Sequence, residues 1–255
     1  LKVAGETAAA RRVSRDAAAL AGRVPGSDGD PEVSGRLALE RGRTALVAGD
    51  LVGAARTFDA VAASAASEGL REEAMFEAAE ARFFAGQFDS AAAGYDAFAR
   101  AWPGSEHAND ALERVYLIEG GGTPPPGLAD LAAASLAARA GDVAGAREKA
   151  ERAEQSAQGG AAWSHAALLV ASLLESQGKL AEAAAKAKAV AEARPDDRLA
   201  PTARRRAGDL LLAAGDAPAA LSQYEELLVR YPRSWLAPET RRRVQELRAR
   251  QGGTP

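Results

Sequence analysis

The sequence predicts an all-α fold, a solenoid built from antiparallel helix hairpins. Alanine dominates the apolar residues and aromatics make up 5% of the chain, a balance that favours helices over sheets. A Gly-x-apolar signature recurs, with glycines spaced 37, 55, 37 and 37 residues apart. Small, apolar and proline residues recur at fixed distances from each glycine. The signature glycines are Gly49, Gly86, Gly141, Gly178 and Gly215.

Each recurring position has a role in a helical hairpin. The glycine ends the first helix with a positive φ. A small residue seven positions earlier and an alanine five positions later let two helices approach closely, and the apolar positions form one stripe on the second helix. A proline then ends the second helix in three repeats. The small residues are Gly42, Ala79, Ala134, Ala171 and Gly208; the alanines are Ala54, Ala91, Ala146, Ala183 and Ala220; the stripes add Phe58, Val61, Tyr95, Phe98, Ala150, Ala153, Ala187, Val190, Tyr224 and Leu227; the prolines are Pro103, Pro195 and Pro232.

Taken in order, these signals divide the chain into five segments. Ala150 replaces the aromatic in repeat 3, which also lacks the final proline, so we expect this repeat to be thin. A long coiled coil is the structural rival, and it is excluded by Gly and Pro breaks every 15 to 20 residues or so. The segments are an N-terminal helix, 1–25, read as a partial repeat; repeats 1–2 plus an extra helix, 32–119; a Gly/Pro linker, 120–127; repeats 3–5 plus a capping helix, 128–250; and a frayed tail, 251–255.

Over residues 32–250 the pattern resembles the tetratricopeptide repeat (TPR) family, although the 37-residue spacing exceeds that family's usual period of about 34. The endings Ala101-Trp102-Pro103-Gly104-Ser105 and Arg230-Tyr231-Pro232-Arg233-Ser234 are similar to those of its bacterial envelope branch, the BamD and CpoB type. The resemblance implies a right-handed superhelix whose first helices line a concave, protein-binding face.

Charge and composition limit the function classes. The net charge is −3 and there is no cysteine, which excludes disulfides and thiolate chemistry. Residues 1–126 carry a balance of −6 and residues 127–255 one of +3, while 198–255 alone reach +5. No apolar run of membrane-spanning length occurs. Because the chain begins at Leu1, we expect the natural product to be longer.

No catalytic or cofactor motif is found. His107 and His165 fall on different predicted helices, so a helical zinc pair is absent. The glycine run 120–122 lacks the Lys and Ser/Thr of a phosphate loop. Adjacent acidic pairs, such as Glu72 and Glu73, diverge around a helix and do not face each other as a glycosidase pair. We therefore expect no enzyme activity, no metal and no cofactor.

Two features allow alternatives. The triplets 204–206 and 241–243 are all arginine, and they form either solvated helix faces or a docking site for an acidic partner or phosphate groups. Phe76, Phe83 and Phe84 either anchor a partner or pack the interface between repeats 1 and 2. Nucleic acid is not expected, because aromatic residues do not alternate with the basic ones.

Family positions carried onto the first helices give a candidate partner-binding set on the concave face. The two-carboxylate clamp of chaperone-binding family members is not present in this set. Its members are Arg36, Leu39, Arg43, Glu73, Phe76, Glu80, Phe83, Leu131, Ser135, His165, Leu168, Ser172, Glu175, Thr202, Arg205 and Asp209.

The sequence therefore predicts a non-enzymatic protein–protein interaction scaffold. The envelope resemblance favours an accessory subunit of a bacterial periplasmic or membrane-associated assembly. The alternative is a regulatory or recruiting module of a larger protein whose catalytic or membrane part lies upstream of residue 1. A third hypothesis is an anionic surface bound by the Arg-rich C-terminal end.

Overall fold

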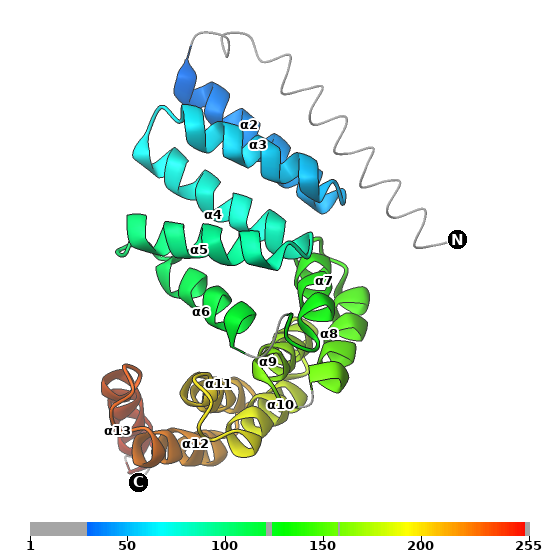
Figure 1. Cartoon of the computed structure of the whole chain (residues 1–255). Helices are drawn as coiled ribbons and strands as arrows, with labels where there is room; N and C mark the ends of the chain where they lie inside the picture. Colours follow the sequence, from blue (N-terminus) through cyan, green and yellow to red (C-terminus); the bar gives the residue numbers. More distant parts are fainter. Residues whose placement is uncertain (1–29, 121–123, 158, 253–255) are drawn as a thin grey trace. The chain divides into compact units, whose positions relative to one another are not determined.

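The computed structural model describes residues 30–120, 124–157 and 159–252, and its regular elements there are twelve helices (Figure 1). The chain forms two compact units, one ending at Pro125 and the other beginning at Pro126. The segment 1–25, expected to be a helix, lies outside the described residues, as do 121–123 of the expected linker and 253–255 of the expected tail.

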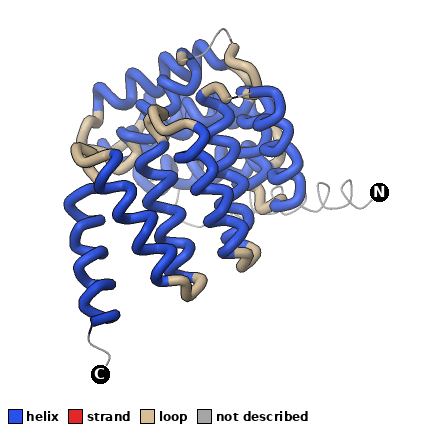
Figure 2. The backbone as a smooth tube through the Cα atoms, turned by 90° about the horizontal axis from the view of Figure 1, so that it is seen from below, coloured by secondary structure: helices blue, strands red, loops and turns tan. Residues whose placement is uncertain are grey.

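The first unit contains two helix hairpins and a final helix, and the second contains three hairpins and a final helix. Within each unit, consecutive helices pack against each other and are joined by short loops (Figure 2). The first-unit helices are α2 (Pro31–Val47), α3 (Leu51–Ser64), α4 (Glu68–Phe84), α5 (Phe88–Ala101) and α6 (Ala108–Glu119). The second-unit helices are α7 (Leu128–Arg139), α8 (Val143–Ala157), α9 (Ala161–Ser176), α10 (Leu180–Ala193), α11 (Ala200–Ala213), α12 (Ala217–Arg230) and α13 (Ala237–Gly252).

The hairpin turns are built as the sequence predicts. All five signature glycines have a positive φ, from 72° at Gly86 to 88° at Gly49. The N–H of the next residue reaches back to the first helix, as in Asp50 to the Ala45 carbonyl at 2.9 Å, and this bond closes the helix end. The same Asp50 then caps the second helix by accepting from the Gly53 N–H at 2.9 Å. One short motif therefore ends one helix and begins the next.

The small residues bring the two helices of a hairpin together. A Cβ added to Gly42 would lie 2.4 Å from the Phe58 ring, and one added to Gly208 would lie 2.5 Å from the Tyr224 ring. In the α4–α5 hairpin the glycine lies on the second helix instead, where Gly94 faces Ala79 of the first helix. The aromatic rings therefore lie directly on the backbone of the first helix, which buries them completely.

The core of each unit combines these rings with alanine. The five alanines that follow the signature glycines are completely buried. Around α8 the interior contains Ala134 and Ala150 together with Val170 and Leu174. Each unit is therefore a solenoid of stacked helix hairpins, and the predicted all-α fold class is confirmed.

The two units contain the same five-helix arrangement. The bounds of α3 and α5 coincide with those of α10 and α12 after a shift of 129 residues. We call α2–α6 array 1 and α9–α13 array 2; the hairpin α7–α8 precedes array 2. The shift pairs residues of the two arrays one to one, so that position 86 corresponds to 215, for example.

Candidate partner-binding surface

The first-helix face is the surface formed by α2, α4 and α6 in the first unit and by α7, α9, α11 and α13 in the second. Its most charged group in the first unit surrounds Arg43 of α2. The guanidinium contacts Glu40 at 2.6 Å and Glu77 at 3.0 Å, and it also pairs with Glu73. Burial lowers the pKa of Arg43, but the hydrogen bonds that it donates to Glu73, Glu77 and Glu40 outweigh burial and raise it. Three carboxylates, two of them on α4, therefore gather around the Arg43 guanidinium.

A second polar group joins α4, α5 and α6. The Tyr95 hydroxyl donates to the Glu80 carboxylate, and Arg114 Nε of α6 donates to the same oxygen at 3.2 Å. The Arg114 guanidinium also lies 4.4 Å from the centre of the Phe83 ring, a cation–π contact. Burial, followed by the Glu80 charge, raises the pKa of Tyr95 well above its usual value. We call this group the array 1 clasp.

Array 2 contains the equivalent group, the array 2 clasp. The Tyr224 hydroxyl donates to Asp209 at 2.6 Å, and Arg243 of α13 donates to the same oxygen at 2.6 Å. Burial and the Asp209 carboxylate raise the pKa of Tyr224 to about 12. Beside this clasp, Arg205 contacts both oxygens of Glu239 at 2.8 and 3.1 Å.

The phenylalanines of α4 serve mainly as packing. Phe83 is completely buried and Phe84 is 8% exposed. Phe76 is half-buried, and its ring stacks on His107 with a centroid separation of 4.5 Å. It also lies 5.3 Å from the Phe98 ring. These contacts join α4 to α5 and to the α5–α6 connection, so of the three rings only Phe76 has an edge available to a partner.

Several members of the predicted set are turned away from the surface. Leu39 and Leu131 are each 2% exposed, and with Phe83 they face neighbouring helices, so we omit these three from the proposed surface. Glu80 is buried within the array 1 clasp. Ser135 and Ser172 donate to carbonyls of their own helices, at 2.9 and 3.0 Å.

The other predicted residues remain accessible to different degrees. Arg36 is exposed and pairs with Glu32 at 2.9 Å, and Glu175 is exposed and pairs with Arg206 at 2.7 Å. Thr202 is exposed. The half-exposed members are Arg43, Glu73, Phe76, His165, Leu168, Arg205 and Asp209.

Neither arginine triplet fits one of the two sequence interpretations as a whole. Arg204 is neither solvated nor available for docking, because its side chain is 1% exposed and bonds to Gln223 at 3.0 Å and Glu226 at 2.7 Å. Arg205 and Arg206 are engaged in the pairs described above. In the second triplet, Arg243 belongs to the array 2 clasp, whereas Arg241 and Arg242 are exposed and form no ion pair with any residue that the structure describes. Adjacent arginines on one helix therefore have separate roles.

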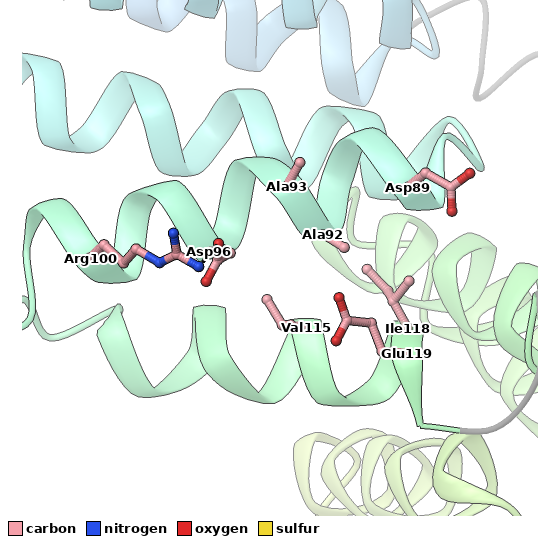
Figure 3. Close-up of a pocket in the computed structure, with 8 residues that line it drawn as sticks. All are labelled: Asp89, Ala92, Ala93, Asp96, Arg100, Val115, Ile118 and Glu119. Atoms are coloured by element: carbon pink, nitrogen blue, oxygen red, sulfur yellow. Dashed lines mark ion pairs between the residues drawn. The ribbon is translucent and has the colours of Figure 1, made fainter.

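A groove of about 570 Å³ lies between α5 and α6, away from the predicted set (Figure 3). Its α5 wall holds Asp89 and Asp96, and its α6 wall ends with Glu119. Arg100 neutralises Asp96 at 2.6 Å, so the groove keeps an acidic character at its Asp89 and Glu119 end.

The described residues contain no group of three or more His, Cys, Asp or Glu side chains placed to hold a metal ion. Within those same residues, none of the helices has both the length and the apolar character needed to cross a membrane.

Sequence reasoning missed Arg114 and treated Tyr95 and Tyr224 only as apolar positions. A signal did exist. In each array the tyrosine follows its carboxylate by 15 residues, and the arginine follows that carboxylate by 34. Comparing the arrays at the 129-residue shift would have revealed this shared spacing.

No protein-family model matches the chain, and no curated protein matches it. Among solved structures, the chain is similar to YrrB, described as a TPR protein with an unusual peptide-binding site, with 16% identity, 81% of this chain and 91% of that chain covered, and a TM-score of 0.37. It is also similar to TTC0263, a thermophilic TPR protein of Thermus thermophilus, with 16% identity, coverage of 84% and 98%, and a TM-score of 0.37. A chain of the APC/C hetero-tetramer Cut9–Hcn1 gives 16% identity, coverage of 94% and 46%, and a TM-score of 0.40. At these values the similarities carry no argument about function, which we base on the side chains.

Proposed function

We propose that the chain is a non-enzymatic scaffold for protein–protein interaction and that its first-unit face binds a basic polypeptide segment. One observation carries this proposal. Three carboxylates, from Glu40, Glu73 and Glu77, gather around the Arg43 guanidinium. The side chains of Glu40 and Glu73 remain 65% and 36% exposed, so both can accept further donors from a partner.

The arrangement favours binding because the acids are already held in place. Arg43 joins two helices, since Glu40 lies on α2 while Glu73 and Glu77 lie on α4. A partner that meets fixed carboxylates loses less side-chain entropy on binding than one that must order them. The exposed carboxylates of Glu40 and Glu73 also attract Lys and Arg side chains from a distance and speed their encounter. The half-exposed edge of Phe76 on the same helix offers an apolar contact beside the acids.

The test is binding of a fluorescent Lys/Arg-rich peptide, followed by anisotropy, with a neutral peptide of equal length for comparison. We expect the basic peptide to bind and the Glu40→Gln/Glu73→Gln variant to bind roughly tenfold more weakly, a change typical of two lost charge-assisted contacts. Arg43 and Glu77 stay in place, so the α2–α4 contact is preserved. Glu246→Gln, an exposed acid on α13, is the matched control and should leave binding unchanged. Equal affinity of wild type and the double variant would contradict the proposal.

We further propose that the scaffold belongs to a bacterial envelope or membrane-associated assembly. The proline-containing endings at 101–105 and 230–234, which resemble the envelope branch of the family, support this placement. Affinity capture from the membrane fraction of the source cells should recover a partner whose retention depends on Glu40 and Glu73. A partner retained equally by the double variant would count against the acidic face as its site.

The alternative is a recruiting module of a longer protein. The full reading frame upstream of Leu1 separates the two possibilities. A catalytic domain there favours the recruiting module, and a short export signal or lipid anchor favours the envelope subunit.

A further inference from the structure

The connection between α12 and α13 carries the two most exposed large hydrophobic side chains in the described residues. Trp235 is 80% exposed and Val229 is 79% exposed, whereas the next in rank reach 48%. They flank a single short connection, with Val229 on the last turn of α12 and Trp235 just before α13. Isolated exposed apolar residues are common on protein surfaces, but two such residues around one turn call for an explanation.

The turn itself does not require a tryptophan. The same backbone turn occurs in array 1, where Ser105 N–H bonds to the Trp102 carbonyl and Ala108 N–H to the Ser105 carbonyl, at 3.0 and 3.1 Å. In array 2, Ser234 and Ala237 make the equivalent bonds at 3.0 and 2.9 Å. The corner position of this turn is occupied by Glu106 in array 1 and by Trp235 in array 2. A glutamate whose side chain is 88% exposed therefore satisfies the local geometry equally well.

The indole of Trp235 is not used for packing within the chain. Trp102, three residues before its own turn's serine, donates from Nε1 to Glu68 at 3.0 Å and packs against Phe98. Trp235 has no hydrogen bond or ring contact to another described residue. Its apolar surface therefore remains available to an external medium.

Unpaired arginines lie on both sides of this tryptophan in the sequence. Arg230 and Arg233 lie in the same connection, and Arg241 and Arg242 lie in the first turns of α13; all four are exposed and lack an ion pair among the described residues. The matching positions of array 1 hold no basic residue, since they are Ala101, Gly104, Leu112 and Glu113. The exposed tryptophan, the exposed valine and four free cations are thus all specific to array 2.

We propose that the α12–α13 connection binds the surface of an anionic lipid bilayer. Trp235 and Val229 enter the interfacial layer, where an indole ring is favoured, and the four arginines meet lipid phosphates. A bilayer fits these observations better than a protein pocket. A protruding turn needs no complementary cavity to enter a lipid interface, whereas a hot-spot tryptophan on a protein surface requires one. This attachment is peripheral, and it uses none of the residues of the acidic first-unit face.

The experiment is co-sedimentation of the whole chain with phosphatidylcholine vesicles, with and without phosphatidylglycerol. We expect binding only to the phosphatidylglycerol vesicles, and we expect added salt to weaken it because exposed charges are screened. Trp235→Glu installs the residue that array 1 uses at this corner, so the fold is retained, and binding should fall roughly tenfold or more. Arg230→Gln/Arg233→Gln should reduce binding by a similar factor while the melting temperature stays unchanged.

Glu106→Trp is the matched control. It places a tryptophan at the equivalent corner of array 1, where the nearest arginine in sequence, Arg100, is paired with Asp96, and it should not increase vesicle binding. Unchanged binding of Trp235→Glu to phosphatidylglycerol vesicles would overturn the proposal. It would equally be overturned if vesicles failed to bind while a polyglutamate peptide bound in a Trp235-dependent way, because the surface would then serve an acidic protein.

Discussion

Array 1 and array 2 share a skeleton and differ in what they present to solvent. The shared positions are those that turn or fasten helices, such as Gly86 and Gly215 at the turns and Arg114 and Arg243 in the clasps. The unshared positions include Phe76, which corresponds to Arg205. The comparison teaches that one scaffold tolerates opposite surface chemistry, so the unshared exposed residues are the better guide to partners.

Each clasp joins a carboxylate, a tyrosine and an arginine, and solvent exposure decides how much these contacts contribute to stability. In array 1 the side chains of Glu80 and Arg114 are 10% and 21% exposed, and Phe83 covers the guanidinium. In array 2 Asp209 and Arg243 are each 36% exposed. If its arginine is removed, Asp209 of array 2 is solvated far better than Glu80 of array 1. Removing one partner should therefore cost more in array 1.

Replacing the clasp arginines is expected to change the free energy of unfolding the most. Arg114→Leu leaves the Glu80 carboxylate buried without a cation and should lower the free energy of unfolding by about 3 kcal/mol. Arg243→Leu should lower it by about 1 kcal/mol or less, because Asp209 is solvated and lies 3.3 Å from Arg205 as well. Urea denaturation followed by circular dichroism measures both. Equal losses would show that burial does not distinguish the clasps.

The tyrosine hydroxyls come next. Tyr95→Phe removes a hydrogen bond to a buried carboxylate and should cost about 2 kcal/mol of unfolding free energy. Tyr224→Phe should cost about 1 kcal/mol, since its acceptor Asp209 is partly solvated. Both rings stay in place, so the differences report the hydroxyl alone. The same denaturation assay applies, and a larger loss at Tyr224 would reverse the ranking.

A smaller effect, alike in both arrays, is expected at the glycines beneath the rings. Gly42→Ala would place a Cβ 2.4 Å from Phe58 and Gly208→Ala one 2.5 Å from Tyr224. The steric overlap costs about 1–3 kcal/mol, whereas the higher helix propensity of alanine stabilises the helix by about 1 kcal/mol. Each substitution should therefore lower the free energy of unfolding by about 1 kcal/mol overall. Gly69→Ala in α4 meets no atom within 4 Å and should not destabilise. If all three variants behave alike in thermal melts, the close-packing explanation fails.

The smallest effect concerns acid stability. Burial raises the pKa of Asp197, but bonds from Leu199 N–H, Ser164 and Arg194 outweigh burial and lower it overall. A depressed carboxyl pKa stabilises the fold above the unfolded value of about 3.9, and that contribution is lost as pH falls through the folded value. Asp197→Asn should therefore flatten the decline in melting temperature below about pH 4. Glu68→Gln, the matched position in array 1, carries a side chain that is 67% exposed and should change the decline less.

Sequence reasoning located the turns because glycine is almost alone in adopting a positive φ without strain. It identified the close approaches for a similar reason, since only a missing or small side chain admits a ring at Gly42. The sequence alone did not predict which residues the charged side chains contact. Arg204, Arg205 and Arg206 are identical in sequence, yet one is buried against α12 and the others pair with α13 and α9. A helix spreads adjacent residues by about 100°, and only the packed neighbours decide what each one meets.

The predicted partner-binding set was partly wrong for the same reason, because the sequence does not show which side chains the packed neighbours bury. Leu39, Phe83 and Leu131 were placed on the surface by family position, but their large apolar side chains are buried against neighbouring helices. Trp235 was not selected at all, because an exposed corner and a buried one have the same local sequence pattern. Comparing it with Glu106 across the two arrays would have drawn attention to it.

The position of the clasps has a consequence for the ends of the arrays. Among the second helices only α5 and α12 carry a tyrosine nine residues after the signature glycine; the others carry Phe58, Ala150 or Ala187, which have no hydroxyl. Both clasps therefore fasten the last helix of an array, α6 or α13, to the hairpin before it. Within its own unit, the last helix of a stack has a neighbour on one side only, and such helices are the first to open. The clasp resists fraying where it would start, and amide hydrogens of α6 and α13 should exchange nearly as slowly as those of the interior helices.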